Sequence, residues 1–421
     1  MSPFESLVTE YIDKNQSEMV SLLAKLVAFD TQNFISYGRE KECQEYIASI
    51  YEKLGLETDL FAPTSIPGIK EHPDFLDGRA AEDRPNVVGV YKAENETGRV
   101  MLAAHTDTMP VGDPEKWTVS PFGGEIKDGK MFGLGIGDNK FGLATSYFAL
   151  KAVIDSNIPL RKSVVLCAYS DEEYGGGNGA LASALKYPCD VIVNTDGGSY
   201  EIWMVAPGGS VYEIKLKTVK PVDSAAKMID ALYKTKARLE QFADKRRMEM
   251  HNNKWFRGTD LEKGAYRITE FSVGKAGANL DTGQLTFVFY TDQAKEAIER
   301  ELKAIESSLI AELEGEGIVT EGFYPTTRFF HYQEADKNDP AIALMTELAS
   351  DEIGYPIKQS GASLSDLSLF LKYGSKSSFN FGIFGDFARA GGAHQPDEYV
   401  ELRELLAHAK ALARFIVKWC T

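Results

Sequence analysis

Apolar side chains recur at helical spacing in the first part of the chain. Residues 4–29 place Leu7, Leu23 and Leu26 on one face, and residues 39–54 repeat the pattern. This period predicts two surface helices. Four prolines in residues 63–85 then exclude any regular element, so this stretch is predicted to be a loop excursion.

Short runs that are apolar almost without interruption follow. They cover residues 100–104, 164–169 and 191–193, and residues 143–154 between the first two have a helical pattern. Strands that are apolar on both faces and alternate with helices are typical of a sheet covered on both sides. We therefore expect an α/β fold with a mostly parallel sheet and helices on both faces.

The pattern changes after residue 208. The elements predicted there are a strand at 211–217, a helix at 224–250, strands at 266–273 and 285–290, and a helix at 294–314. The order β-α-β-β-α predicts an inserted α+β domain at 209–325, so that residues 1–208 and 326–421 together form the α/β domain. Helices at 341–353, 364–371 and 402–419 and a strand at 379–384 complete this α/β domain.

Composition narrows the class of protein. The chain has 421 residues, of which 43% are hydrophobic. It contains 46 Lys and Arg residues and 62 Asp and Glu residues, which gives a net charge of −16. Such an acidic protein is repelled by nucleic acid and by anionic lipid. Its apolar runs are far shorter than the roughly 20 residues that span a bilayer. We expect a cytoplasmic protein, because the sequence shows no secretory signal and its four cysteines have no Cys-x-x-Cys spacing.

Polar residues follow each predicted strand of the sheet. In α/β sheets ligands bind at the carboxyl ends of the strands, so these residues are expected to share one crevice. In chain order they are His105 and Asp107 after 100–104, Glu172 and Glu173 after 164–169, Asp196 after 191–193, and His394 in the loop that follows 379–384.

Imidazole and carboxylate together suit zinc, cobalt or manganese. His105 and Asp107 are two positions apart on an extended chain and leave the same face, so Asp107 is placed to orient the His105 ring. Asp138 follows the glycines of 133–137 at the start of a helix, where its carboxylate can bridge two ions. Several acids in one crevice require cations, because burying unpaired charge is costly.

Each motif also has a simpler interpretation. His72 and Asp74 repeat the His-x-Asp pattern in the proline-rich loop, where we expect them to lie on the surface without a functional role. The glycines at 133–137 and 175–179 have neither G-x-G-x-x-G spacing nor a P-loop lysine, which argues against nucleotide binding. The chain has no G-x-S-x-G elbow, and Cys167 lies inside an apolar strand.

Together the motifs resemble those of the co-catalytic zinc peptidase family that includes aminoacylase, acetylornithine deacetylase, succinyl-diaminopimelate desuccinylase and the glutamate carboxypeptidases. The resemblance extends over nearly the whole chain. Its motifs are Ala-His-Thr-Asp-Thr-Met-Pro at 104–110, Trp-Thr-Val-Ser-Pro-Phe at 117–122 leading to 133–140, Ser-Asp-Glu-Glu at 170–173, Thr-Asp-Gly at 195–197 and Ala-His-Gln-Pro-Asp-Glu at 393–398.

The resemblance implies a hydrolase with two divalent metal ions, expected to be zinc, with cobalt or manganese as alternatives. Its substrate would be a small peptide or an N-acyl amino acid, cleaved at an amide bond. The roles implied are His105 and Asp196 on one ion, Glu173 and His394 on the other, Asp138 as the bridge, Glu172 as general base and Asp107 as the residue that orients His105.

The resemblance also implies that residues 1–208 and 326–421 form the catalytic domain and that the inserted domain at 209–325 is its lid. This lid would contact substrate, through Asn279, and join two chains in a homodimer. The chain departs from the family in two places: no histidine follows the strand at 211–217, and Tyr290 stands where relatives carry a carboxylate-binding arginine. Binding of a free substrate carboxylate would then need Arg328 or Arg389 as a substitute. A second hypothesis is therefore a non-catalytic, metal-containing binding protein of the same fold.

Overall fold

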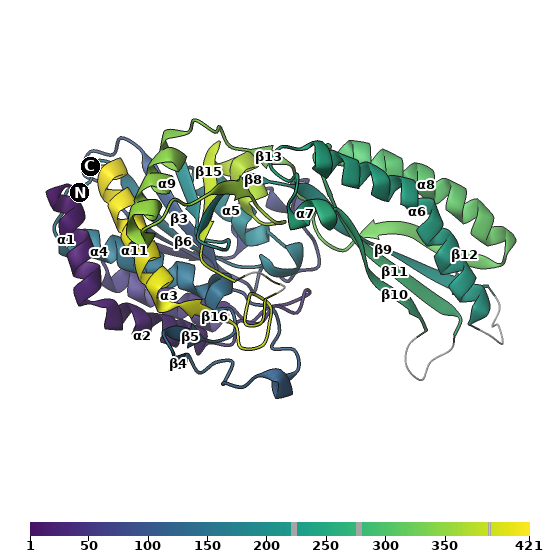
Figure 1. Ribbon diagram of the computed structural model, residues 1–421, viewed down its shortest axis with the longest axis horizontal. Coiled ribbons are helices and arrows are strands. Elements are labelled where there is room, and N and C mark those ends of the chain that lie inside the picture. The colour runs from purple at the N-terminus through teal and green to yellow at the C-terminus, as the bar shows by residue number, and fades with distance from the viewer. Residues whose placement is uncertain (220–224, 275–279, 386, 388) are drawn as a thin grey trace. The chain divides into compact units, whose positions relative to one another are not determined.

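The computed structural model describes residues 1–219, 225–274, 280–385, 387 and 389–421. These residues divide into two compact units (Figure 1). The first comprises Met1–Val205 and Glu334–Thr421, and the second comprises Ala206–Gln333. The insertion predicted for 209–325 falls within the second unit.

The first unit is built on a nine-stranded sheet in the order β1-β2-β6-β3-β7-β15-β8-β13, with β14 beside β8. Its central strands β6, β3, β7 and β15 are parallel, whereas β2 and β8 pair antiparallel with their neighbours β6 and β15. The mostly parallel sheet predicted from the apolar runs is confirmed. The bounds are β1 Glu57–Phe61, β2 Asn86–Tyr91, β3 Arg99–His105, β6 Ser163–Tyr169, β7 Val191–Asn194, β8 Glu201–Ala206, β13 Gln333–Glu334, β14 Gln359–Gly361 and β15 Ser377–Gly382.

Helices cover both faces of this sheet (Figure 1). On one face Phe381 of β15 stacks on His408 of α11, with ring centroids 4.4 Å apart. On the other face Val165 and Ile192 pack in one apolar cluster with Leu181 of α5. The helices are α1 Pro3–Lys14, α2 Gln16–Val27, α3 Lys41–Lys53, α4 Phe141–Asp155, α5 Asn178–Lys186, α9 Pro340–Ile353, α10 Leu367–Leu369 and α11 Leu402–Cys420.

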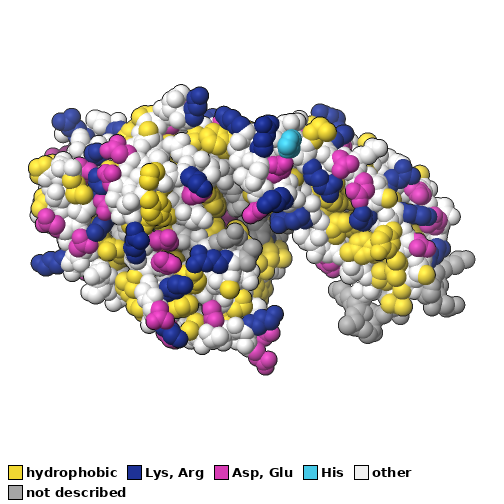
Figure 2. Space-filling view, viewed as in Figure 1, with side chains coloured by type: hydrophobic (Ala, Val, Ile, Leu, Met, Phe, Trp, Pro, Cys, Tyr) yellow, Lys and Arg dark blue, Asp and Glu magenta, His cyan; other side chains and the backbone are white. Residues whose placement is uncertain are grey.

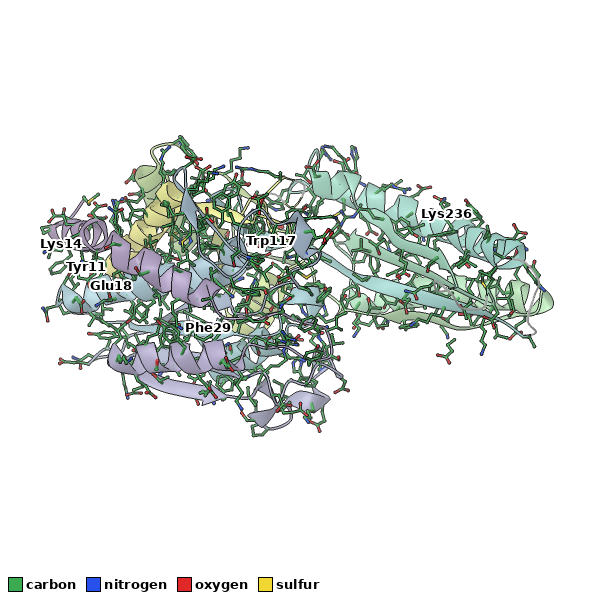
Figure 3. The ribbon with its side chains drawn as sticks, turned by 90° about the horizontal axis from the view of Figure 1, so that it is seen from below. Tyr11, Lys14, Glu18, Phe29, Trp117 and Lys236 are labelled. Atoms are coloured by element: carbon green, nitrogen blue, oxygen red, sulfur yellow. The ribbon has the colours of Figure 1, made fainter. Side chains whose placement is uncertain are left out.

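The prediction of one helix over 4–29 is wrong in one respect, because the structure has two helices there, which meet at Asn15. The Tyr11 carbonyl accepts the ordinary helical bond from the Asn15 backbone N–H at 3.0 Å and a second bond from the Asn15 side-chain amide at 2.7 Å. The backbone of Asn15 leaves the helical conformation, with φ −110° and ψ 19°, and α1 ends there. Such local side-chain hydrogen bonds compete with the helical ladder. Figure 3 labels Tyr11 before this break and Glu18 after it. The helix predicted over 364–371 is also shorter than expected, with α10 followed by a wider turn, Phe370–Gly374.

The proline-rich segment 63–85 is not a surface excursion throughout. Asp74 is buried, lies 3.0 Å from Lys372 Nζ and accepts a hydrogen bond from the Tyr373 hydroxyl at 2.5 Å. The His72 ring packs edge-on against Tyr373 at 4.7 Å. The prediction that both residues lie on the surface is therefore wrong for Asp74, and His72 is half-buried, because this segment packs back onto its own unit.

The second unit is a four-stranded antiparallel sheet in the order β10-β11-β9-β12. Its long helices α6 and α8 lie on one face (Figure 1), over a core that includes Ile214, Leu239 and Phe287. The strand β12 was not predicted, since its exposed and polar positions hide the alternation of a strand. The bounds are β9 Gly208–Thr218, β10 Tyr266–Val273, β11 Thr282–Thr291, β12 Ile318–Pro325, α6 Ala226–Asn252, α7 Asp260–Lys263 and α8 Lys295–Gly315.

A small third sheet belongs to the first unit. Strand β5 (Lys130–Phe132) pairs with β4 (Ile126–Lys127) on one side and with β16 (Tyr399–Glu401) on the other. The pairing of β16 with β5 brings residue 398 beside the glycine-rich turn that follows β5. A segment from late in the chain is thereby fixed to the loop that carries Asp138.

The charges on the surface and the state of the cysteines agree with what the sequence predicts. Acidic and basic side chains are interspersed on the face shown in Figure 2. All four cysteines are free thiols, and Cys43, Cys167 and Cys420 are buried. Among the described helices, none combines the length and the apolar character that crossing a bilayer requires.

Candidate metal centre

His105 is the last residue of β3, and its completely buried ring has a polar partner on each nitrogen. Nδ1 lies 2.9 Å from the backbone carbonyl of Asp107 and 3.7 Å from its carboxylate, and Nε2 lies 2.8 Å from Asp138 Oδ1. Since a carbonyl only accepts, Nδ1 carries the proton that bonds to Asp107, which leaves Nε2 free to bind a cation. Asp107 thus orients His105 mainly through its backbone.

The Asp107 carboxylate contacts a different part of the chain, the loop that follows β6. It accepts hydrogen bonds from the backbone N–H groups of Glu172 at 3.0 Å and Glu173 at 2.9 Å. The Asn33 side-chain amide also donates to it, at 2.8 Å. Asp107 therefore fixes the start of the loop that follows β6, where the predicted base and one predicted ligand lie.

Asp138 lies in a turn, Ile136–Lys140, that leads into α4. Glu398 holds this turn, because its carboxylate accepts from the backbone N–H groups of Gly135, Gly137 and Asp138 at 3.0, 2.7 and 3.1 Å. Gly135 has φ +68°, and a Cβ there would lie 2.1 Å from Thr108, so the turn requires glycine. Lys140 anchors the far side by donating at 2.8 Å to the carbonyl of Phe29, which Figure 3 labels.

The five predicted ligands form two groups that share Asp138. His105, Asp138 and Asp196 offer ligand atoms that lie within 4.8 Å of one another, and so do Asp138, Glu173 and His394. Asp138 Oδ1 faces His105, while its Oδ2 lies 3.2 Å from His394 Nε2. His394 Nε2 is also 3.1 Å from Glu173 Oε2, and its side chain is 31% exposed. One carboxylate therefore joins the two groups, one oxygen to each.

The donor set fits divalent cations. Asp196 and Glu173 are buried beside Asp138, and burial raises the pKa of Asp196 to about 7, with the Asp138 charge adding to the effect. Burial opposes ionisation of Asp138 as well, but hydrogen bonds from His105 and His394 hold its pKa below the ordinary value. Three carboxylates and two imidazoles in two groups of three match the ligands of a borderline cation such as zinc.

Glu172 differs from its neighbour Glu173 in having no place in either group. Burial raises the pKa of Glu172 well above the ordinary value, and the charges of Asp366 and Asp196 add to this effect against the opposing His105. A carboxylate with a raised pKa beside a metal site has the properties of a general base.

The structure also reveals site residues that the sequence did not suggest, among them Asn33 and Glu398. Glu398 follows His394 within the same motif, so its place after His-Gln-Pro-Asp was the available signal. Asn33 follows α2 and carried no signal.

Of the predicted substrate contacts, Asn279 lies outside the described residues. Tyr290 is buried in β11, and its hydroxyl accepts from Arg267 at 3.2 Å. Arg328 is buried in the second unit with its guanidinium 3.8 Å from the Phe330 ring, and Arg389 in the first unit stacks at 5.1 Å on Tyr399.

Known proteins resemble this chain in sequence and in fold. The model of the family described as Peptidase family M20/M25/M40 matches residues 101–418. The chain is 29% identical over 204 residues to N-formyl-4-amino-5-aminomethyl-2-methylpyrimidine deformylase of Halalkalibacterium halodurans, an alignment that covers 48% of this chain and 43% of that protein. It is 35% identical over 133 residues to succinyl-diaminopimelate desuccinylase of Rhodospirillum centenum, covering 32% of this chain and 31% of the relative. The chain thus matches less than half the length of these relatives.

Among solved structures, an M20 family metallo-carboxypeptidase from Sulfolobus solfataricus superposes with a TM-score of 0.72. The superposition covers 95% of this chain and 98% of that one, at 18% sequence identity. At this identity the likeness shows a shared fold, which extends over both units.

Proposed function

Because the chain belongs to peptidase family M20/M25/M40, we propose that it is a dinuclear metal-dependent hydrolase that cleaves an amide bond of a peptide or an N-acyl amino acid. The observation that carries this proposal is Asp138, whose two oxygens face His105 and His394 separately. We propose zinc as the metal, with cobalt or manganese as alternatives, and the cytoplasm as the location.

Each predicted residue has a defined task in this reaction. When bound, two cations of this kind polarise a scissile carbonyl and lower the pKa of a water molecule toward about 7. Glu172 would take the proton from that water and pass it to the departing nitrogen. Asp107 would keep His105 in the tautomer that leaves Nε2 free, and would hold Glu172 in place through its backbone N–H.

Replacing the base tests the proposal. Glu172→Gln keeps the size of the side chain but cannot accept a proton, so turnover is expected to fall about 100- to 10,000-fold. Metal content, measured by elemental analysis, should stay at the wild-type level. The matched control is Glu173→Gln, which should lower the metal content because it alters a ligand. A near-normal rate for Glu172→Gln would remove this residue from the role of base.

The substrate class is tested with a panel of dipeptides and N-formyl, N-acetyl and N-succinyl amino acids, with zinc, cobalt or manganese added. We expect turnover of at least one class. The absence of the lid histidine and the presence of Tyr290 are the reasons for the second hypothesis, a binding protein of the same fold. Glu172 and all five predicted ligands are present, which favours the hydrolase. Metal-loaded protein that is inert across the panel, yet binds one of its members in calorimetry, would support that alternative.

We also propose a homodimer formed through the second unit, Ala206–Gln333. Light scattering after size-exclusion chromatography should then give the mass of two chains. A monomer at micromolar concentration would contradict this part of the proposal and leave the chemistry of the first unit unaffected.

A further inference from the structure

Two arginines from the proline-rich segment are buried beside the predicted metal centre. Arg84 is 0% exposed and Arg79 is 3% exposed, although each carries a full charge. A buried guanidinium is costly unless it is paired with acidic or carbonyl groups. The partners of both arginines therefore indicate what holds them there.

Arg84 joins three carboxylates that come from distant parts of the chain. Its Nη1 donates to Asp171 at 2.6 Å, and its Nη2 and Nε donate to Glu40 at 2.5 and 2.9 Å. Nη2 also lies 3.7 Å from Asp107 Oδ2. Arg84 thus links Asp107, whose carboxylate accepts from the N–H groups of Glu172 and Glu173, to Asp171, the residue that precedes Glu172.

Arg79 contacts the same loop at two further points. Its Nε donates to Asp171 at 3.1 Å, and its Nη2 donates to the backbone carbonyl of Glu173 at 2.8 Å. The Asn33 amide reaches the same carbonyl at 3.1 Å. The Arg79 contacts do not involve the Glu173 carboxylate, whose Oε1 accepts from the Met109 backbone N–H at 3.1 Å and whose Oε2 faces His394.

The loop needs such support because its backbone is strained. Asp171 and Tyr174, on either side of Glu172 and Glu173, have φ of 63° and 57°. Aspartate tolerates such values, whereas a bulky tyrosine adopts them rarely and needs the surrounding structure to hold it there. Contacts on the Asp171 side chain, on two N–H groups and on the Glu173 carbonyl together set the directions in which Glu172 and Glu173 point.

We propose that Arg79 and Arg84 are positioning residues that hold the Glu172–Glu173 loop in the geometry required for metal binding and proton transfer. This inference rests on the proposed function. The planar guanidinium is essential to the arrangement, because each arginine serves two separate groups at once and an ammonium cannot reproduce that fork. Loss of either arginine should weaken the ion held by Glu173 and His394 more than the ion held by His105 and Asp196.

Arg79→Met is the first test. Partners of metal ligands typically contribute 10- to 100-fold to metal affinity, so we expect binding of one of two cobalt ions to weaken by about that factor. The measurement is titration of the chelator-treated protein with cobalt, followed by visible absorption and by competition with a chelator. Arg79→Lys should recover only part of the affinity. Arg84→Met should have a larger effect, since it leaves Glu40, Asp107 and Asp171 buried together.

The matched control is Arg414→Met. Arg414 is also 3% exposed and pairs with buried Glu5 at 3.0 Å and with Glu352 at 2.7 Å, but it touches none of the predicted metal ligands. Arg414→Met should lower the melting temperature without changing the affinity for either cobalt ion. Equal cobalt affinities in Arg79→Met, Arg79→Lys and Arg414→Met would overturn the inference.

A double-mutant cycle assigns the effect to one ion. In a His394→Ala background only the His105 and Asp196 ion remains, and Arg79→Met should leave its affinity unchanged. An equal loss in that background would show a general structural effect and would overturn the inference. If wild-type protein binds fewer than two cobalt ions, the proposed function itself fails, whereas two ions with no effect of Arg79 refute this inference alone.

Discussion

The loop around Asp138 and the loop around Glu173 are fixed by similar hydrogen bonds in different electrostatic surroundings. Glu398 accepts three backbone N–H groups from the first loop, and Asp107 accepts two from the second. Arg84 lies beside Asp107, whereas burial raises the pKa of Glu398 to about 8, with the Asp138 charge adding to this rise. Asp107 thus has an ion pair with Arg84, whereas the charges of Lys140 and His394 act on Glu398 without an ion pair among the described residues. The two loops should therefore respond differently to loss of charge.

The largest effect is expected at the residue that serves both loops. Asp138→Ala removes the carboxylate that faces both His105 and His394, so both ions should be lost and turnover should fall to background. Elemental analysis after dialysis measures this loss. Asp196→Ala is the control, since it should release one ion and keep the other. Two ions retained by Asp138→Ala would show that the bridge is wrongly assigned.

Neutralising each supporting carboxylate sharpens the comparison directly. Asp107→Asn leaves the Arg84 charge partly unbalanced and should weaken metal binding about 10- to 100-fold. Glu398→Gln keeps one oxygen, which can accept from Gly137 and Asp138, and loses the acceptor for Gly135. It breaks no ion pair among the described residues, so we expect a loss below about 10-fold. Cobalt competition measures both. Equal losses would mean that the electrostatic surroundings do not distinguish the two loops.

The smallest effect on catalysis, but a clear one on stability, is expected at a histidine outside both loops. The charged partners Asp138 and Glu173 outweigh burial and raise the pKa of His394, whereas burial lowers the pKa of His408 to about 4. The unfolded chain therefore binds this proton more readily than the folded one. Stability from neutral His408 is complete above pH 6.5 and is lost as the pH falls toward 4, by ~3 kcal/mol.

The measurement is denaturant unfolding of metal-free protein between pH 4 and pH 7. His408→Gln keeps a donor for the Phe381 carbonyl, which accepts from His408 Nε2 at 2.9 Å, and should flatten this part of the profile. Activity of the metal-loaded variant at pH 7 should stay near that of the wild type. An unchanged profile in the variant would assign the pH dependence to other groups.

Much of the first unit was predictable because strong local patterns coincide with the chemistry there. The apolar runs that became β3, β6 and β7 fixed the sheet, and the polar residues that follow them led to His105, Glu173 and Asp196. Asp138 and His394 were found through short motifs. The structure brings these five residues together, although their sequence separation exceeds the reach of any periodicity.

The supporting residues were not predictable for a physical reason. Arg79 and Arg84 lie in a stretch that shows only prolines and mixed polarity, and their burial depends on Glu40 and Asp171 from other elements. The break at Asn15 depends on one side-chain hydrogen bond inside an otherwise continuous helical pattern. Interactions of this kind leave no period in the sequence.

The pairing of β16 with β5 bears on how the protein is made. During translation His105, Asp138, Glu173 and Asp196 emerge first, and the whole of Ala206–Gln333 must follow before His394 and Glu398 leave the ribosome. Until then the Asp138 turn lacks the Glu398 carboxylate that supports it, and the group of Asp138, Glu173 and His394 lacks its imidazole. A nascent chain therefore cannot complete the proposed centre, so loading with the two proposed ions would be complete only in molecules whose synthesis has passed β16.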